Sequence, residues 1–261
     1  MKKKKLALLG YGYLSKVVAD AVKDGIISEY EIVGVMGRSS DKVSEFAKNY
    51  SCKACDNIEE IMDLEPDFVA EAASPKTIVD NAKTILEGGS NLVVISIGAF
   101  ADLEFYEEIK KTALENNTKL YIPGGAVGGF DLLQVATLRG PIDITVTSKW
   151  PPKHFQNTRY FKEGLMDIEE PERVFTGNVK KIMEEYPETY NVAVAMALAS
   201  AGLQDTKLNI DAVPGLEGDE YNLHVKGDKM EVDINVHAPD YNIAGWSIVE
   251  TLKNAASPVV F

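Results

Sequence analysis

The sequence has little cysteine, little histidine, no long apolar run and fewer basic than acidic residues. Its 261 residues include two cysteines and three histidines, and the acidic excess gives a formal net charge of −13. No apolar run approaches the roughly 18 residues that span a bilayer, so we expect no contact with a membrane. An acidic surface repels phosphate backbones, which argues against a nucleic-acid partner.

The two cysteines form a Cys52-x-x-Cys55 pair in the segment Ser51–Asp56, which has the pattern of a short strand. One pair supplies only two zinc ligands, and the histidines are distant in sequence. A redox pair would usually begin a helix. We therefore expect reduced thiols in a cytoplasmic protein and no metal site.

The first residues combine four lysines with the apolar stretch Leu6–Leu9, as the start of a signal peptide would. However, Gly10, Tyr11 and Gly12 follow at once, and no small-residue cleavage site comes after them. The stretch therefore predicts a first strand flanked by lysines.

The first half of the chain alternates between strand and helix patterns. This order predicts a parallel sheet with helices on both faces. The predicted strands are Lys5–Leu9, Glu31–Met36, Ser51–Asp56, Asp67–Ala72, Asn91–Ile97 and Lys119–Ile122. The predicted helices are Leu14–Val22, Asp41–Asn49, Ile58–Met62, Pro75–Glu87 and Leu103–Asn116.

After Gly124 the pattern changes to strands with one covered face. We expect an α/β protein with an N-terminal Rossmann domain, residues 1–123 plus the helical segment 244–261, and a second α+β domain, residues 124–243, with a mixed or antiparallel sheet. The second domain's predicted strands are Asp143–Ser148, Asn209–Val213, Glu220–Lys226 and Lys229–Val236. Its predicted helices are Lys180–Tyr186 and Val192–Ser200, and the last helix is Ala244–Ala256.

A glycine motif follows the first strand and begins the first helix. Gly10-x-Gly12-x-x-Ser15 is the dinucleotide pattern with serine in the third place. Gly10 permits a tight turn, and Gly12 lets the backbone approach a pyrophosphate at the helix N-terminus. The strand before and the helix after supply the context that this short motif requires. We therefore expect an NAD- or NADP-binding site.

The end of the second strand lacks the acidic residue that usually binds the ribose of NAD. Arg38, Ser39 and Ser40 follow Gly37 there. An arginine with hydroxyl neighbours can bind a 2′-phosphate, which favours NADP over NAD. The alternative is that Arg38 stacks on the adenine of either cofactor.

The chain resembles the L-aspartate dehydrogenase family nearly from end to end. The most specific match is the glycine-rich stretch from Pro123 to Asp131. The other stretches that carry the resemblance are Glu71–Pro75, Ser96–Asp102, Lys149–Pro152, Tyr186–Pro187 with Asn191–Ala193, and Asn222–His224.

The resemblance implies reversible oxidation of L-aspartate to iminosuccinate, which hydrolyses to oxaloacetate and ammonia. It implies that Ala126 and Asn191 contact the cofactor near its nicotinamide and that His224 is the catalytic histidine. Imidazole titrates near neutrality and can move the proton that accompanies hydride transfer. We also expect a homodimer whose substrate is a small amino or keto acid. The cofactor-binding residues that we expect are Gly10, Gly12, Tyr13, Leu14, Arg38, Ser39, Ala73, Ser74, Ala126 and Asn191.

The expected substrate residues are Gly125, Gly128, Lys149 and Asn222. The glycines lie where an open α/β sheet binds ligands, and their free N–H groups can bind a carboxylate; a hinge between domains is a compatible interpretation. Lys149 and Lys153 are the candidate cations for a carboxylate.

Two stretches depart from the family pattern. Val213-Pro214 replaces an Asp-Pro pair, and the segment His237–Tyr241 lacks the family's lysine. A related dehydrogenase or imine reductase acting on another small amino or keto acid, and a non-enzymatic dinucleotide sensor, therefore remain alternatives.

Overall fold

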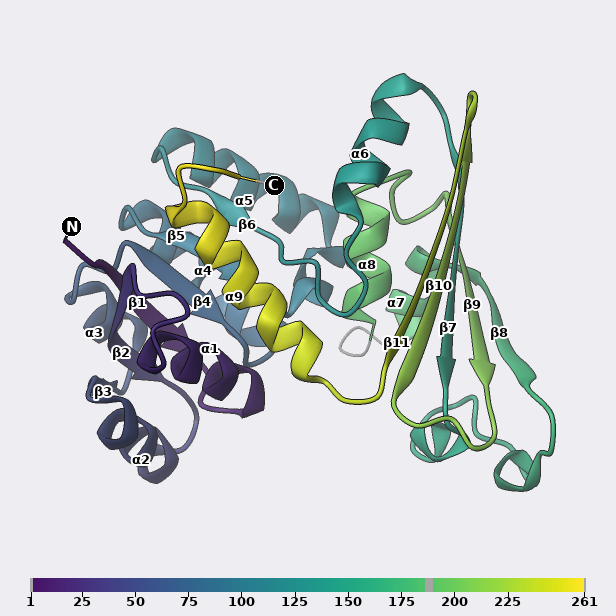
Figure 1. Cartoon of the computed structure of the whole chain (residues 1–261), viewed down its shortest axis with the longest axis horizontal. Helices are drawn as coiled ribbons and strands as arrows, with labels where there is room; N and C mark the ends of the chain where they lie inside the picture. The colour runs from purple at the N-terminus through teal and green to yellow at the C-terminus, as the bar shows by residue number, and fades with distance from the viewer. Residues whose placement is uncertain (1, 186–189, 261) are drawn as a thin grey trace. The chain divides into compact units, whose positions relative to one another are not determined.

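The computed structural model describes residues 2–185 and 190–260, which form two compact units. Unit 1 comprises residues 1–125 and 242–261, and unit 2 comprises residues 126–241. The predicted α/β class, with a Rossmann-like parallel sheet followed by a mixed sheet, is confirmed (Figure 1). No helix in the described part of the chain is long and apolar enough to cross a membrane.

Unit 1 contains a six-stranded parallel sheet in the order β3-β2-β1-β4-β5-β6. The strands are β1 (Lys4–Leu9), β2 (Tyr30–Met36), β3 (Lys53–Cys55), β4 (Phe68–Glu71), β5 (Asn91–Val94) and β6 (Leu120–Tyr121). The helices are α1 (Tyr13–Lys23), α2 (Ser40–Tyr50), α3 (Ile58–Met62), α4 (Pro75–Glu87), α5 (Leu103–Glu115) and α9 (Asn242–Ala256).

Helices cover both faces of this sheet. One buried cluster joins residues of α1, α2 and α9 to one face, including Leu6 and Leu8 of β1. The alternate residues Ala7 and Leu9 are also fully buried, as a strand covered on both faces requires.

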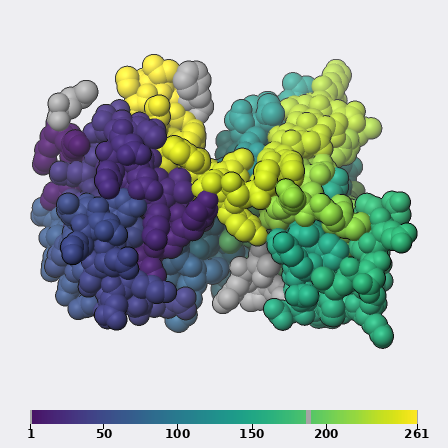
Figure 2. Space-filling view, turned by 60° about the horizontal axis from the view of Figure 1, so that its bottom comes forward, coloured from purple at the N-terminus to yellow at the C-terminus, as the bar shows by residue number. Residues whose placement is uncertain are grey.

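The C-terminal helix α9 packs against the first helix of the chain. A Cβ at Gly245 would lie 2.8 Å from Val17, so glycine lets α9 approach α1 closely. The buried hydroxyl of Tyr30 donates a hydrogen bond to the Leu252 carbonyl oxygen at 2.7 Å. Figure 2 shows the yellow C-terminal residues directly against the purple start of the chain.

Unit 2 contains a five-stranded sheet in the order β11-β10-β7-β9-β8, in which only β7 and β9 run parallel. The strands are β7 (Asp143–Trp150), β8 (Glu172–Asn178), β9 (Thr206–Ala212), β10 (Asp219–Gly227) and β11 (Met230–Ala238). The α-helices are α6 (Phe130–Arg139), α7 (Val179–Glu185) and α8 (Asn191–Leu198).

The helices of unit 2 lie on one side of its sheet (Figure 1). Residues on that side are buried in alternation along β7 and β10, and the residues between them are half-buried or exposed. We call these the covered face and the open face. Every residue of β10 therefore belongs to one of two different environments.

Several elements differ from the sequence prediction. The strand predicted for Asn91–Ile97 ends at Val94, and a 3₁₀ helix, η1 (Ile97–Ala101), follows. Strand β8 was not predicted because it is an edge strand with only Phe175 buried. Helix α6 was not predicted because only Leu133 and Ala136 among its residues are buried, which leaves a weak helical pattern. The helix predicted for Lys180–Tyr186 is α7, and Tyr186 lies outside the described residues.

Candidate functional site

The two glycines of the motif are required for different structural reasons. Gly10 adopts φ +110°, and a Cβ there would lie 2.4 Å from the Ala72 carbonyl oxygen. Only glycine fits this turn. Gly12 is the N-cap of α1, and a Cβ there would meet nothing within 4 Å. The turn is therefore fixed on one side and open on the side where a pyrophosphate would meet the helix N-terminus.

The next residues connect this turn to the rest of unit 1. The exposed Tyr13 donates a hydrogen bond from its hydroxyl to the side chain of Asn242 on α9. Leu14 packs against the core of the unit. Ser15 is buried, and its hydroxyl has no hydrogen-bond partner within the described ranges. A small residue is required here, because the Ser15 oxygen lies 3.2 Å from where a Cβ of Gly10 would be.

The end of β2 presents an uncompensated cation. A Cβ at Gly37 would lie 2.5 Å from the Tyr11 ring, which explains why no larger residue occupies this position. Arg38 is exposed, and it makes no ion pair with any residue that the structure describes. Ser39 caps α2 through its backbone, and its side chain makes no cap hydrogen bond. Both side chains are therefore available to a ligand.

A buried carboxylate holds the loop after β4. Glu71 is fully buried, and its Oε1 accepts hydrogen bonds from the N–H groups of Ala73 at 2.7 Å and Ser74 at 2.9 Å. Ser96 donates to both Glu71 oxygens, from its hydroxyl at 2.7 Å and its N–H at 3.1 Å. Burial raises the pKa of Glu71, and these donors oppose the rise.

Glu71 thus fixes Ala73 and Ser74, two residues predicted to bind the cofactor, and joins their loop to the chain after β5. No role for Glu71 follows from the sequence alone. The available signal was a carboxylate at the end of the otherwise apolar strand Phe68–Glu71. The bonds to Ser96 also explain why β5 ends early.

The glycine-rich loop between the units adopts left-handed backbone conformations at Gly125 (φ +60°), Gly128 (φ +74°) and Gly129 (φ +75°). The Gly125 N–H donates to the Ser247 hydroxyl of α9 at 3.1 Å. A Cβ at Gly128 would meet nothing within 4 Å, so its backbone is accessible. Ala126 and Gly128, predicted for cofactor and substrate respectively, are both half-buried.

Three predicted residues lie together on the open face of unit 2. Lys149 of β7 pairs with Glu220 of β10 in the sheet register, and its Nζ lies 2.5 Å from the Glu220 carboxylate. Asn222 donates to the Asn235 side chain at 2.5 Å. His224 is the next residue of β10 on that face, so the sheet does align Lys149, Asn222 and His224.

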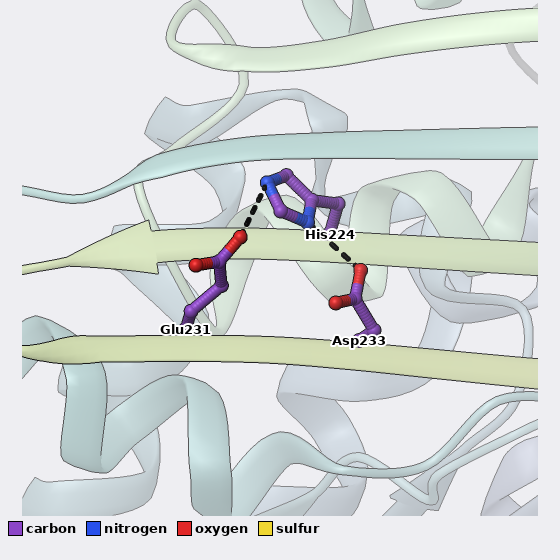
Figure 3. A group of neighbouring side chains, drawn as sticks. All are labelled: His224, Glu231 and Asp233. Atoms are coloured by element: carbon purple, nitrogen blue, oxygen red, sulfur yellow. Dashed lines mark hydrogen bonds and ion pairs between the residues drawn. The ribbon is translucent and has the colours of Figure 1, made fainter.

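His224 is exposed, and two carboxylates of β11 flank its ring (Figure 3). Its Nδ1 lies 2.8 Å from Asp233, and its Nε2 lies 3.8 Å from Glu231. These three residues are the one group with metal-ligand geometry in the described ranges, with ligand atoms within 4.8 Å of one another. Of the two carboxylates, only Asp233 is at hydrogen-bond distance from the imidazole; Glu231 lies beside its other nitrogen.

Asn191 lies on the opposite side of the sheet. It is the first residue of α8, and the preceding Tyr190 stacks on Trp150 with ring centroids 5.2 Å apart. Trp150 is buried on the covered face. The structure therefore places Asn191 on the covered face and His224 on the open face of the same sheet.

The covered face also carries polar residues that are not among the predicted site residues. Asp219, Tyr221 and Trp150 are buried there, and His154 lies at their edge. The signal was the alternation of β10, which places Asp219 and Tyr221 with the apolar residues.

The cysteine pair is part of the fold of unit 1. Cys55 is buried at the end of β3, Cys52 is half-buried, and both thiols are free. Burial raises the pKa of Cys52 to about 11 and also raises the pKa of Cys55. Thiols of this kind are poor nucleophiles at neutral pH.

The glycine turn at the N-terminus of α1 and the parallel sheet define unit 1 as a dinucleotide-binding domain, followed by a second domain with a mixed sheet. Residues 10–123 match the NAD-binding domain of homoserine dehydrogenase, and residues 131–255 match the C-terminal domain of aspartate dehydrogenase. The chain is 30% identical to L-aspartate dehydrogenase of Methanosarcina barkeri and 27% identical to that of Methanocaldococcus jannaschii, over 98% of each chain. It belongs to the L-aspartate dehydrogenase family.

Solved structures show the same fold. Aspartate dehydrogenase of Thermotoga maritima matches with a TM-score of 0.81 at 22% identity over 99% of both chains. An amine dehydrogenase of Mycobacterium smegmatis matches with a TM-score of 0.60 at 13% identity, over 99% of this chain and 94% of that one.

Proposed function

We propose that this protein is an NAD(P)-dependent L-aspartate dehydrogenase, which oxidises the CH–NH₂ group of L-aspartate reversibly to iminosuccinate. The observation that carries the proposal is family membership across both units, since one match covers the dinucleotide domain and the other covers unit 2. Iminosuccinate then hydrolyses to oxaloacetate and ammonia.

The residues of unit 1 fit a nicotinamide dinucleotide. Gly12 leaves room for the pyrophosphate, and Ala73 and Ser74 are held at the same edge by Glu71. When bound, the dinucleotide supplies a hydride acceptor. We propose NADP as the preferred form, because Arg38 is an exposed cation without an ion pair among the described residues and no carboxylate occurs in residues 37–40, which directly follow β2.

We propose Lys153 as the cation for a substrate carboxylate. Lys149 is already paired with Glu220, so its charge is compensated. Lys153 is exposed in the short 3₁₀ helix η2 (Pro152–Phe155), beside the covered face, and has no ion-pair partner in the part of the chain described. The other predicted substrate residues, Gly125, Gly128 and Asn222, and the predicted catalytic residue His224 stay predictions.

The test is to incubate the purified protein with L-aspartate and either NAD⁺ or NADP⁺ and to follow the reduced cofactor by absorbance. The reverse direction uses oxaloacetate, ammonium and the reduced cofactor. We expect turnover in both directions and none from Gly12→Val. Absence of turnover with a protein that binds the dinucleotide would reject L-aspartate as substrate.

A second candidate is a related dehydrogenase or imine reductase for another small amino or keto acid. The observation that favours it is the segment His237–Tyr241, which contains no lysine, together with the compensated charge of Lys149. A panel of monocarboxylic and dicarboxylic amino acids distinguishes the two. Lys153→Ala should raise KM for dicarboxylates alone if the first proposal holds.

A further inference from the structure

The open face of β10 and β11 carries polar side chains that oppose one another across the two strands. In the antiparallel register His224 is opposite Asp233, and Lys226 is opposite Glu231. Directly opposite Cβ atoms in such a pair lie about 4.5–5.5 Å apart, and diagonal neighbours lie farther apart. The register therefore places Asp233 directly beside the His224 ring and Glu231 on a diagonal to it.

The contacts of the imidazole follow this register. Asp233 Oδ1 lies 2.8 Å from His224 Nδ1, which is hydrogen-bond distance. Glu231 Oε1 lies 3.8 Å from Nε2, which is too long for a hydrogen bond (Figure 3). Two carboxylates of β11 therefore flank one imidazole, and only one of the two bonds it. The two ring nitrogens of His224 are in different surroundings.

The hydrogen bond fixes the tautomer of the ring. An ionised carboxylate only accepts hydrogen bonds, so the proton of the neutral His224 imidazole must be on Nδ1, and Nε2 presents its lone pair. His237 on β11 shows the reverse arrangement. Its Nε2 lies 2.8 Å from the carbonyl oxygen of Glu217, which also only accepts, so the proton of His237 is on Nε2. Two histidines of one sheet are therefore held in opposite tautomers.

The fold does not depend on the pair of His224 and Asp233. Their side chains are 46% and 63% exposed, and exposed ion pairs contribute little to the free energy of unfolding. His224 is the one ion-pair partner of Asp233 within the described ranges, and β10 and β11 stay joined by their backbone ladder. Removal of the Asp233 carboxylate should therefore alter the imidazole and leave the Tm unchanged.

We propose that Asp233 is a positioning residue for His224, which it holds with Nε2 unprotonated so that this nitrogen accepts the proton of the substrate's α-ammonium group. The inference rests on the proposed function, with His224 as its acid–base residue, and assigns what orients that residue. In the step, one N–H bond of the ammonium group breaks and an Nε2–H bond forms. The electron pair left on the substrate nitrogen forms the C=N bond, as the Cα–H bond breaks and its hydride leaves for the oxidised dinucleotide.

The tautomer can be measured without any turnover. Proton–nitrogen correlation NMR spectra at about pH 9, where imidazoles are neutral, show which ring nitrogen carries the proton. In the wild type we expect the proton on Nδ1 of His224 and on Nε2 of His237, and His224→Gln identifies the first signal. In Asp233→Asn the His224 proton should move toward Nε2, because the asparagine amide group can donate to Nδ1, and His237 should be unchanged. A wild-type His224 with its proton on Nε2 would overturn the inference.

Turnover tests the role of the hydrogen bond. Asp233→Asn should lower kcat for L-aspartate by about 10–100-fold, which is part of the 10²–10⁴ that positioned proton transfer contributes. Dinucleotide affinity should change by less than about two-fold, because unit 1 holds the dinucleotide. Asp233→Glu keeps a carboxylate that can accept from Nδ1 and should recover most of the loss. Glu231→Gln is the matched control, since it removes the same charge beside the same ring without removing a hydrogen bond, and its kcat should stay within about three-fold of the wild type.

Equal losses in Asp233→Asn and Glu231→Gln would assign the effect to charge alone and overturn the inference. Losses that multiply when Asp233→Asn is combined with His224→Gln would overturn it as well, because a residue that acts through His224 has no further effect once the imidazole is gone. One equivalent of bound metal in the wild type that Asp233→Asn lacks would assign the pair to a metal instead. If the wild type oxidises no amino acid with either dinucleotide, the proposed function fails, and the spectra still determine the tautomer. If it oxidises L-aspartate and Asp233→Asn does so equally, only this inference fails.

Discussion

Each unit of the molecule buries a carboxylate at the end of a strand, but the two carboxylates have different surroundings. Glu71 ends β4 with both oxygens bonded to N–H and O–H groups of the loops it joins. Asp219 begins β10 with one oxygen bonded to Tyr221 and the other without a hydrogen bond in the part of the chain described. Burial raises the pKa of both.

The difference separates a fully bonded buried carboxylate from a partly bonded one. The donors around Glu71 come from the protein's own backbone and from Ser96, so the carboxylate is compensated whether or not a ligand is bound. Asp219 retains an oxygen, Oδ1, without a hydrogen bond among the described residues, and His154 Nδ1 lies 3.6 Å from it. On the open face of unit 2, Lys149 pairs with Glu220 and His224 with Asp233, whereas on the covered face Asp219 has the Tyr221 hydroxyl at 3.1 Å and His154 at 3.6 Å.

The largest effect should follow from removing Glu71. Glu71→Ala leaves two N–H groups and the Ser96 donors unpaired in a dry site, which we expect to lower the free energy of unfolding by about 4–5 kcal/mol. Dinucleotide affinity should fall as well, because Ala73 and Ser74 lose their anchor. Urea denaturation measures the first effect and fluorescence titration the second. Glu59→Ala, an exposed position on α3, should stay within about 0.5 kcal/mol. An equally stable Glu71→Ala protein would remove the contrast between the two carboxylates.

Substitutions in the glycine turn can separate effects on the stability of unit 1 from effects on dinucleotide binding. Gly12→Val places a side chain in open space, so the protein should stay folded while dinucleotide affinity falls by about 100-fold or more, equivalent to about 2.7 kcal/mol. Gly10→Ala should lose stability instead, since its Cβ would meet the Ala72 carbonyl oxygen. Thermal unfolding and cofactor titration on the same samples separate the two. A folded Gly12→Val protein with unchanged affinity would contradict the dinucleotide role of this loop.

Arg38 in unit 1 is an exposed charge without an ion pair among the described residues. Arg38→Ala should weaken NADP binding by roughly 10-fold or more, since a charge-assisted contact is worth about 1.5–3 kcal/mol, and should change NAD binding by less than two-fold. Titration with both cofactors measures the ratio. An equal loss for both would support stacking of Arg38 on the adenine.

The sequence predicted most of the fold because its signals are local. The glycine motif after an apolar strand and the alternation of β7 and β10 suffice to predict the two sheets. Edge strand β8 was missed because burial of Phe175 alone leaves no alternating pattern.

The site was less predictable because it depends on contacts between distant residues. The alternation along β10 predicts that Asn222 and His224 share one face of the sheet and that Asp219 and Tyr221 share the other. Which face the helices cover cannot be inferred from the strand alone. Glu71 bonds Ser96, which is twenty-five residues away in the sequence. His154 lies beside Asp219, which belongs to another element. Neighbouring residues in the sequence therefore predict neither contact.

The smallest expected effect concerns how stability depends on pH. Substitution of Asp219 and of its neighbour Glu220 should change that dependence in opposite directions. Burial raises the pKa of Asp219, so the folded state binds this proton more tightly than the unfolded state does. Stability at this site is therefore lost as pH rises through the folded pKa. Asp219→Asn should equal the wild type in acid, where the carboxyl is protonated in both states, and become more stable than the wild type toward neutral pH.

Glu220 should behave in the opposite way. The hydrogen bond from Lys149 lowers the pKa of Glu220, so its contribution is present above the unfolded pKa and is lost as pH falls through the folded one. Glu220→Gln should be less stable than the wild type at neutral pH, by less than about 1 kcal/mol because the pair is partly exposed, and equal to it in acid. Urea denaturation at several pH values measures both differences. Parallel curves for the two variants would show that Asp219 is compensated like Glu220.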